Sequence, residues 1–149
     1  MREPFDKSTW GPGPWQDEPD HIEWDDAKTG LKCIINRCPG AGHLCGYVGV
    51  LERIKDRYDE NALRAHGGIT FNGDYEEHPG LWFFGFDCGH GGDISPGSEA
   101  HFRHPHVLGV TFPQGATYKD VEYVKSEIED LVKQIFDPLT ALADTLKDD

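Results

Sequence analysis

Two neighbouring stretches, His66-Gly-Gly-Ile-Thr-Phe71 and Leu81-Trp-Phe-Phe-Gly-Phe-Asp-Cys-Gly-His-Gly-Gly-Asp93, decide the fold of this chain. They contain two apolar runs, residues 68–72 and 80–88, whose aromatic and β-branched content is typical of strands. The sequence Asn-Gly-Asp at 72–74 and an acidic linker separate the runs and predict a turn. We therefore expect the runs to pair as antiparallel strands.

Ionisable side chains stand at one end of each run. His66 precedes the first, whereas Asp87, His90 and Asp93 occupy the end of the second and the glycine-rich segment after it. In an antiparallel pair the start of one strand lies beside the end of the other. We expect His66 and Asp87 to lie within about 12 Å of each other, the reach of two side chains on neighbouring strands.

Three uses of this group of side chains stay open. The carboxylates can bond backbone N–H groups of the glycine-rich turn, which is a structural role. The group can also bind a small anionic molecule, with a base stacked on an aromatic ring and with phosphate or ribose held by the histidine and by backbone N–H groups. The residues proposed for such a ligand site are His66, Gly67, Gly68, Arg64, Tyr47, Trp82, Asp87, His90 and Asp93.

A metal site is the third use. His66, Asp87, His90 and Asp93 supply the nitrogen and oxygen ligands that suit zinc, manganese or iron. A divalent metal is therefore a possible cofactor. The signatures G-x-S-x-G, H-E-x-x-H and Walker A do not occur, so the sequence favours a binding protein over an enzyme.

The motifs H-G-G-I-T-F and W-F-F-G-F-D-C-G-H-G-G-D are accompanied by G-P-W-Q-D-E-P-D-H-I-E-W upstream and L-C-G-Y-V-G-V between. With these motifs the chain resembles a family of small proteins encoded by actinobacterial phages and prophages, over residues 11–135. The resemblance implies a phage origin and a shared fold. It implies no activity.

Length and composition predict one domain, and the patterns of strands and helices make its expected class α+β. The chain has 149 residues, 37% of them apolar, which is enough for a single core. No apolar run approaches the ~20 residues of a membrane span, and the N-terminus lacks the apolar segment of a signal peptide. We expect a protein of the host cytoplasm.

The net charge of −13 arises from 14 basic and 27 acidic residues. Because nucleic-acid binding depends on neutralising phosphates with Lys and Arg, this balance argues against direct binding to nucleic acid. An acidic surface can instead dock on a basic host protein such as a nuclease.

The four cysteines, at positions 33, 38, 45 and 88, do not form the C-x-x-C pairs of a zinc ribbon. We expect free thiols, of which three lie in or against strands. A metal site made of Cys38, His43 and Cys45 is a minor alternative.

The expected organisation has three parts. Residues 1–19 form an extended arm rich in Pro, Gly and Trp, residues 20–136 form the domain, and residues 137–149 form a short helix. In the domain we expect an antiparallel sheet of about five strands, with a C-terminal helix packed across one face. The terminal helix carries a leucine stripe that predicts a contact in a homo-oligomer.

The remaining elements follow from periodicity. Residues 21–26, 31–36 and 44–51 predict three strands in a meander, and 107–112 a short edge strand. Residues 52–65 predict a polar helix. Residues 118–135 predict the main helix, with Thr117 as N-cap.

These features lead to one preferred function and two alternatives. The preferred function is a phage accessory protein, acting in counter-defence, that binds and sequesters a nucleotide-type signalling molecule. The first alternative is a metal-dependent hydrolase. The second is an acidic inhibitor of a host protein.

Overall fold

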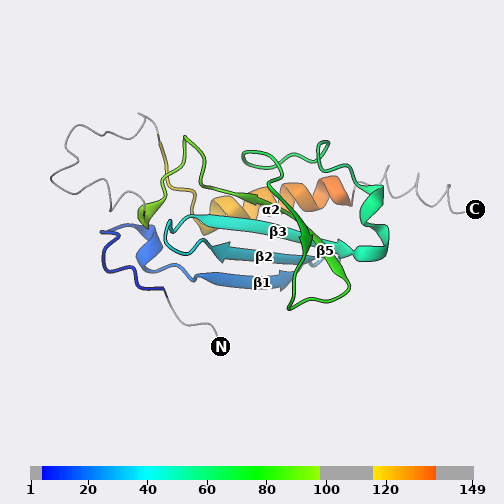
Figure 1. Cartoon of the computed structure of the whole chain (residues 1–149), viewed down its shortest axis with the longest axis horizontal. Helices are drawn as coiled ribbons and strands as arrows, with labels where there is room; N and C mark the ends of the chain where they lie inside the picture. Colours follow the sequence, from blue (N-terminus) through cyan, green and yellow to red (C-terminus); the bar gives the residue numbers. More distant parts are fainter. Residues whose placement is uncertain (1–4, 98–115, 137–149) are drawn as a thin grey trace, which may run out of the picture.

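The structure is a computed structural model that describes residues 5–97 and 116–136. Its centre is a five-stranded antiparallel sheet in the order β1-β2-β3-β5-β4. The strands are β1 (His21–Asp25), β2 (Lys32–Arg37), β3 (Leu44–Leu51), β4 (Phe71–Asp74) and β5 (Leu81–Asp87). One long helix, α2 (Val121–Ile135), covers one face of the sheet (Figure 1). The α+β prediction is confirmed.

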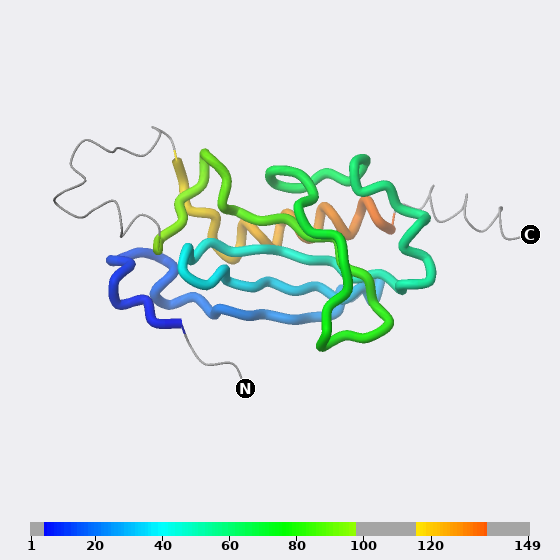
Figure 2. The backbone as a smooth tube through the Cα atoms, in the orientation of Figure 1, coloured from blue at the N-terminus to red at the C-terminus, as the bar shows by residue number. Residues whose placement is uncertain are grey.

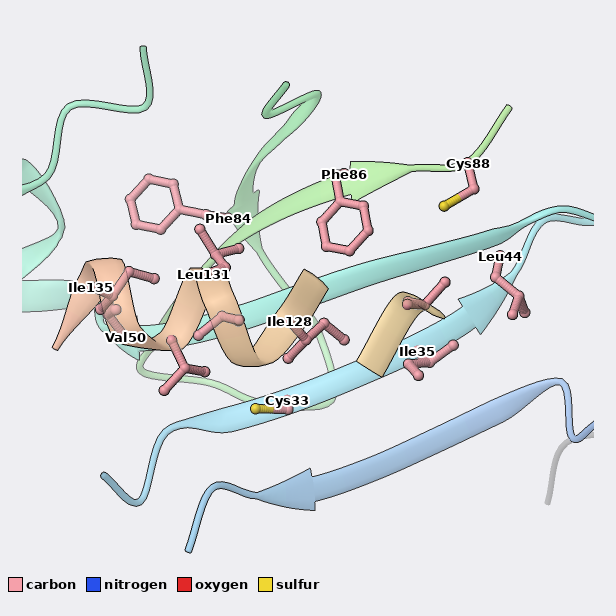
Figure 3. Packing of buried hydrophobic residues seen from close by; sticks show 13 residues of the cluster. Cys33, Ile35, Leu44, Val50, Phe84, Phe86, Cys88, Ile128, Leu131 and Ile135 are labelled. Atoms are coloured by element: carbon pink, nitrogen blue, oxygen red, sulfur yellow. The ribbon is translucent and has the colours of Figure 1, made fainter. Parts of the chain in front are cut away.

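The core lies between α2 and the sheet. Alternate residues of β2, β3 and β5 point to α2 because side chains alternate between the faces of a strand, and Figure 3 shows them meeting the apolar side of the helix. Burying each large side chain contributes about 1.5–3 kcal/mol. The fully buried members are Cys33, Ile35, Leu44, Val48, Val50, Phe84, Phe86, Cys88, Val124, Ile128 and Leu131.

Two glycines in β3 let aromatic rings approach its backbone. A Cβ atom on Gly46 would lie 2.6 Å from the ring of Phe86, and one on Gly49 would lie 2.7 Å from the ring of Phe83. Both distances are shorter than van der Waals contact, so neither position accepts a side chain without displacing the ring.

The other face of the sheet, which we call the helix-free face, is covered only in part. The hairpin that joins β4 to β5 crosses the sheet toward β1, as the green tube in Figure 2 shows. There the rings of Tyr75 and His78 pack on Phe83, with centroids 5.4 and 5.9 Å away. The N-terminal arm covers the other end, where Trp10 and Trp15 are buried.

Two predictions about the chain before β4 are wrong. The first strand of the pair begins at Phe71 rather than at residue 68, and Asn72 to Asp74 belong to the strand rather than to a turn. The cause lies in Gly67 and Gly68, whose φ values of 71° and 88° place them in the left-handed region and outside strand geometry. The turn lies later, ending at Gly80, which also has positive φ.

The polar helix predicted for residues 52–65 is also wrong. Only a 3-10 helix, η2 (Glu52–Arg57), forms, and Tyr58 continues in extended geometry. Its apolar stripe is too thin to hold a longer helix on the sheet, since helical stability in proteins comes mostly from packing of an apolar face.

The start of α2 differs from its prediction. Asp120 is the N-cap and accepts a 2.9 Å hydrogen bond from the N–H of Tyr123. Thr117 instead forms a parallel bridge with Asp93. Tertiary pairing therefore removes Thr117 from the helix, and the next capping residue takes its place.

The edge strand expected at 107–112 and the helix expected at 137–149, with its oligomer contact, lie outside the described residues. Within the described part, no helix combines the length and the apolar character needed to span a membrane.

The packing of α2 generates a stability prediction. Ile128 is fully buried, so Ile128→Ala removes apolar contacts and leaves a cavity, at a cost of about 2–5 kcal/mol. Urea unfolding of the variant measures this loss. Glu129→Ala, at an exposed position of the same helix, is the control and is expected to change the free energy of unfolding by less than about 0.5 kcal/mol. Equal effects of the two substitutions would contradict the assignment of the core face.

Candidate functional site

His66 links α2 with the glycine-rich loop that follows β5. Its Nδ1 atom is hydrogen-bonded to the hydroxyl of Tyr123 at 2.7 Å, and its Nε2 atom to the Asp93 carboxylate at 2.7 and 2.9 Å. Both ring nitrogens therefore have protein partners. Lys119 adds an ion pair with Asp93 at 3.2 Å.

The Asp93 side chain is only 1% exposed. Burial alone raises the pKa of this carboxyl, but hydrogen bonds from His66, from the backbone N–H of His90 and from Lys119 outweigh burial and lower it below its ordinary value. Asp93 is therefore a carboxylate at neutral pH that holds the loop together.

Asp87 and His90 form the second half of the cluster. Nε2 of His90 lies 3.0 Å from an Asp87 oxygen, but this buried nitrogen has no aligned hydrogen bond among the described residues. His43 approaches the other Asp87 oxygen to 3.9 Å, and Thr70 donates a 3.1 Å hydrogen bond to Asp87. The ring centroids of His66 and His90 are 5.8 Å apart. Strand pairing thus gathers the predicted ionisable residues at one end of β5.

Burial affects the protonation of His43. It lowers the pKa of this imidazole below its ordinary value, and the nearby carboxylates of Asp87 and Asp93 offset only part of that effect. His43 is accordingly neutral at pH 7, with its Nδ1 atom 3.1 Å from the hydroxyl of Ser95.

Gly67 has a steric role in the cluster. A Cβ atom at this position would lie 2.1 Å from Nε2 of His90, and its φ of 71° also favours glycine. A Cβ on Gly68, by contrast, would meet nothing within 4 Å. The ring of His90 therefore occupies the place that a side chain at 67 would take.

Three predicted ligand residues lie away from this cluster. Trp82 is near the opposite end of β5, with the Lys55 ammonium 3.8 Å from its ring centroid. Tyr47 is on the helix-free face against Phe71, with centroids 5.4 Å apart. Arg64 is exposed, and its backbone bonds the side chain of Gln134. No aromatic ring from the predicted set stands beside His66 for a base to stack on.

A groove of about 1310 Å³ lies on the helix-free face, between the N-terminal arm and the first three strands. Tyr47 is the only member of the predicted ligand set among its lining residues. These are Phe5, Lys7, Gln16, Glu18, Pro19, Asp20, His21, Asn36, Arg37, Cys38, Pro39, Cys45 and Tyr47.

The lysine and the arginine that line the groove are neutralised by acids. Lys7 pairs with Asp20 at 2.8 Å, and Arg37 pairs with Asp20 at 2.7 Å and with Glu18 at 3.4 Å. The groove therefore offers a bound molecule polar and aromatic contacts rather than free positive charge.

A second histidine cluster, which the sequence did not lead us to predict, stands beside the groove. Nε2 of His21 lies 2.8 Å from the Glu23 carboxylate, and Nε2 of His78 lies 3.1 Å from both oxygens of the same carboxylate. The pattern H-x-E in a strand places His21 and Glu23 on one face, so this half of the cluster could have been predicted from the sequence. No local signal indicates His78, because it reaches Glu23 only through the hairpin.

All four cysteines are free thiols, as predicted. Burial raises the pKa of Cys33 and of Cys45 to about 12, and it raises the pKa of Cys38 and Cys88 as well. The thiols are thus protonated at neutral pH and poor nucleophiles. Across residues 5–97 and 116–136, no three His, Cys, Asp or Glu side chains stand in a ready-made metal site; this includes the set of Cys38, His43 and Cys45.

Comparison of the chain with protein-family models, with curated proteins and with solved structures finds no match. The groove and the two histidine clusters are the basis for the functional proposals.

The first site prediction concerns His66. His66→Ala removes one hydrogen-bond partner from the buried Asp93 carboxylate and one from the Tyr123 hydroxyl, at a cost of about 1–3 kcal/mol in the free energy of unfolding. Urea unfolding measures it, and in the Asp93→Asn background the same substitution is expected to cost less, since the two side chains interact. Additive effects of the two substitutions would contradict the coupling.

The second site prediction concerns the stability of the fold at acid pH. Because the folded-state pKa of Asp93 is lowered, its stabilisation is complete above the unfolded-state pKa of about 3.9 and is lost as pH falls through the folded-state value. The stability difference between the wild type and Asp93→Asn is expected to shrink as pH drops below about 4. Urea midpoints of both chains between pH 6 and pH 3 test this, and parallel curves would contradict it.

Proposed function

We propose that this protein binds a small nucleotide-type molecule in the groove on the helix-free face and sequesters it. The groove, with its volume of about 1310 Å³, carries the proposal. Pockets for drug-sized ligands measure about 300–1,000 Å³, so this one has room for a dinucleotide. Relative to our expectation from the sequence, the binding place moves from His66 to the groove.

An aromatic ring in the groove supports a ligand with a flat base. Tyr47 lines the groove, and Phe71 and Tyr75 pack on its ring edge to face, with centroids 5.4 and 6.2 Å away. Stacking of a base on such a ring is worth about 1–3 kcal/mol.

Polar side chains of the groove supply directional contacts. Gln16, His21 and Asn36 line it together with Cys45. The pKa of Cys45, raised to about 12, keeps this thiol protonated and unsuited to nucleophilic attack. This chemistry favours binding of an intact molecule over turnover.

We place this activity in the cytoplasm of an actinobacterial phage host, as a counter-defence function, following the resemblance of the motifs to phage-encoded proteins. We also propose that the chain forms a homo-oligomer through residues 137–149. A hydrolase that uses His66, Asp87, His90 and Asp93 with a metal is less well supported, because His66 and Asp93 already bond each other, Tyr123 and Lys119.

The net charge of −13 favours a second candidate function, an acidic inhibitor of a basic host protein such as a nuclease. Attraction of this kind acts over the whole surface and weakens steeply with salt. It does not depend on the groove.

Calorimetry with a panel of cyclic and linear nucleotides tests the groove. Tyr47→Leu removes the ring and is expected to weaken binding about 5- to 150-fold, the equivalent of about 1–3 kcal/mol. Trp82→Leu is the matched control, since this aromatic residue of the same sheet lies outside the groove, and it is expected to bind like the wild type. Circular dichroism checks that both variants fold.

Mass spectrometry of the molecule released by denaturation is expected to return the ligand intact. If the wild type binds no member of the panel, or if Tyr47→Leu binds as tightly as Trp82→Leu, the groove proposal fails and the acidic-inhibitor function takes its place.

A further inference from the structure

We propose that His21, Glu23 and His78 form a binding site for a divalent transition-metal ion at the edge of the groove, and that this ion holds the anionic group of the ligand. The metal site stands on its own geometry. Only the contact with the anionic group rests on the function proposed above.

Two imidazoles converge on one carboxylate, the set of donors that zinc and related ions prefer. Zinc–nitrogen and zinc–oxygen bonds of about 2.0–2.2 Å place neighbouring ligand atoms about 3.0 Å apart at right angles and about 3.4 Å apart in a tetrahedron. The Nε2 atoms of His21 and His78 lie 2.8 and 3.1 Å from Glu23 oxygens. Both His–carboxylate separations therefore lie near the spacing of neighbouring ligand atoms around one ion.

The hydrogen bond at Nδ1 of His21 is also compatible with an ion at Nε2. Nδ1 of His21 is hydrogen-bonded to the Asn36 side-chain oxygen, and the Asn36 amide in turn donates to the Tyr75 hydroxyl at 2.6 Å. Both ring nitrogens of His21 thus face oxygen acceptors, whereas a neutral imidazole has one N–H. In the tautomer with the proton on Nδ1, the lone pair of Nε2 faces the Glu23 carboxylate and is available to an ion between them, and such an outer hydrogen bond at Nδ1 is typical of metal-bound histidine.

The elements that carry the three side chains are firmly placed. His21 and Glu23 project from one face of β1, paired with β2 opposite Asn36 and Ile34. His78 is packed against the buried ring of Phe83. The side chains now bond one another rather than enclosing an empty cage, so an ion enters by replacing those hydrogen bonds.

The site is open to solvent on one side. The two histidine side chains are 19% exposed and Glu23 is 26% exposed. Three protein ligands leave at least one coordination position free, as in catalytic zinc centres. Because His21 also lines the groove, this position is within reach of a molecule bound there.

The groove has no unpaired basic side chain among its lining lysine and arginine, so an anionic ligand needs another source of positive charge. Lys7 and Arg37 are paired with Asp20 and Glu18, so neither is free to meet a phosphate. A divalent ion on β1 supplies the positive charge that an anionic ligand requires in a protein of net charge −13.

The experiment is calorimetric titration of metal-stripped full-length chain with Zn²⁺ at pH 7.5. We expect one strong site in the wild type and at least about tenfold weaker binding in Glu23→Gln and in His78→Gln, as loss of a ligand requires. Two controls separate this site from other histidines. His90→Gln tests the cluster at the end of β5, and a joint replacement of His101, His104 and His106 by Ala tests the histidine-rich segment; both are expected to keep the site.

Absence of zinc binding by the wild type, equal binding by Glu23→Gln, or loss of the site in either control would overturn the metal proposal. A second series adds a nucleotide that binds the groove, with zinc and with EDTA. Binding that needs zinc supports the contact between ion and ligand, and unchanged binding in EDTA refutes that contact while the groove function stands. Zinc binding without nucleotide binding would refute the groove function and leave the metal site intact.

Discussion

The hydrogen bonds of the buried Arg37 guanidinium are the interaction that fastens the N-terminal arm, and with it one wall of the groove, to the sheet. This side chain is fully buried and bonds Asp20 at 2.7 Å, the carbonyl of Gly42 at 2.9 Å and the hydroxyl of Tyr118 at 2.9 Å. Burial lowers the pKa of Arg37, but these hydrogen bonds outweigh burial, so the pKa is raised and the charge is permanent. A buried charge with every donor direction in use is stable only while all its partners stay in place.

Those partners come from three separate parts of the chain: the arm before β1, the turn between β2 and β3, and the segment that leads into α2. The arm can therefore lie along the sheet as a wall of the groove although its prolines and glycines exclude regular structure. Glu18 extends the same network, because it also bonds Tyr118 and the N–H of Val121 at the start of α2. One cation thus sets both the shape of the groove and the entry of the helix on the opposite face.

Strand periodicity and strand pairing could be predicted from the sequence, and so could the gathering of His66, Asp87, His90 and Asp93 at one end of the central strand pair. Within β5, Trp82 stands near the start and Asp87 at the end, so the length of the strand itself separates Trp82 from the histidine cluster. Contacts between residues far apart in the sequence could not be predicted in this way. Thr117 has a side chain suited to a helix N-cap, but its β-bridge with Asp93 keeps it outside the helix. His78 meets Glu23 across 55 positions of sequence, and no local pattern encodes such a contact.

The strand order has a consequence for how these molecules meet one another. Among the described residues, the two outer strands are β1, with five residues, and β4, with four. Both are short, and both carry acidic side chains: Glu23 and Asp25 on the first, Asp74 on the second. Exposed strand edges recruit other chains by backbone pairing, and shortness and charge oppose that recruitment. The short, charged edges of the described sheet therefore oppose growth by strand addition.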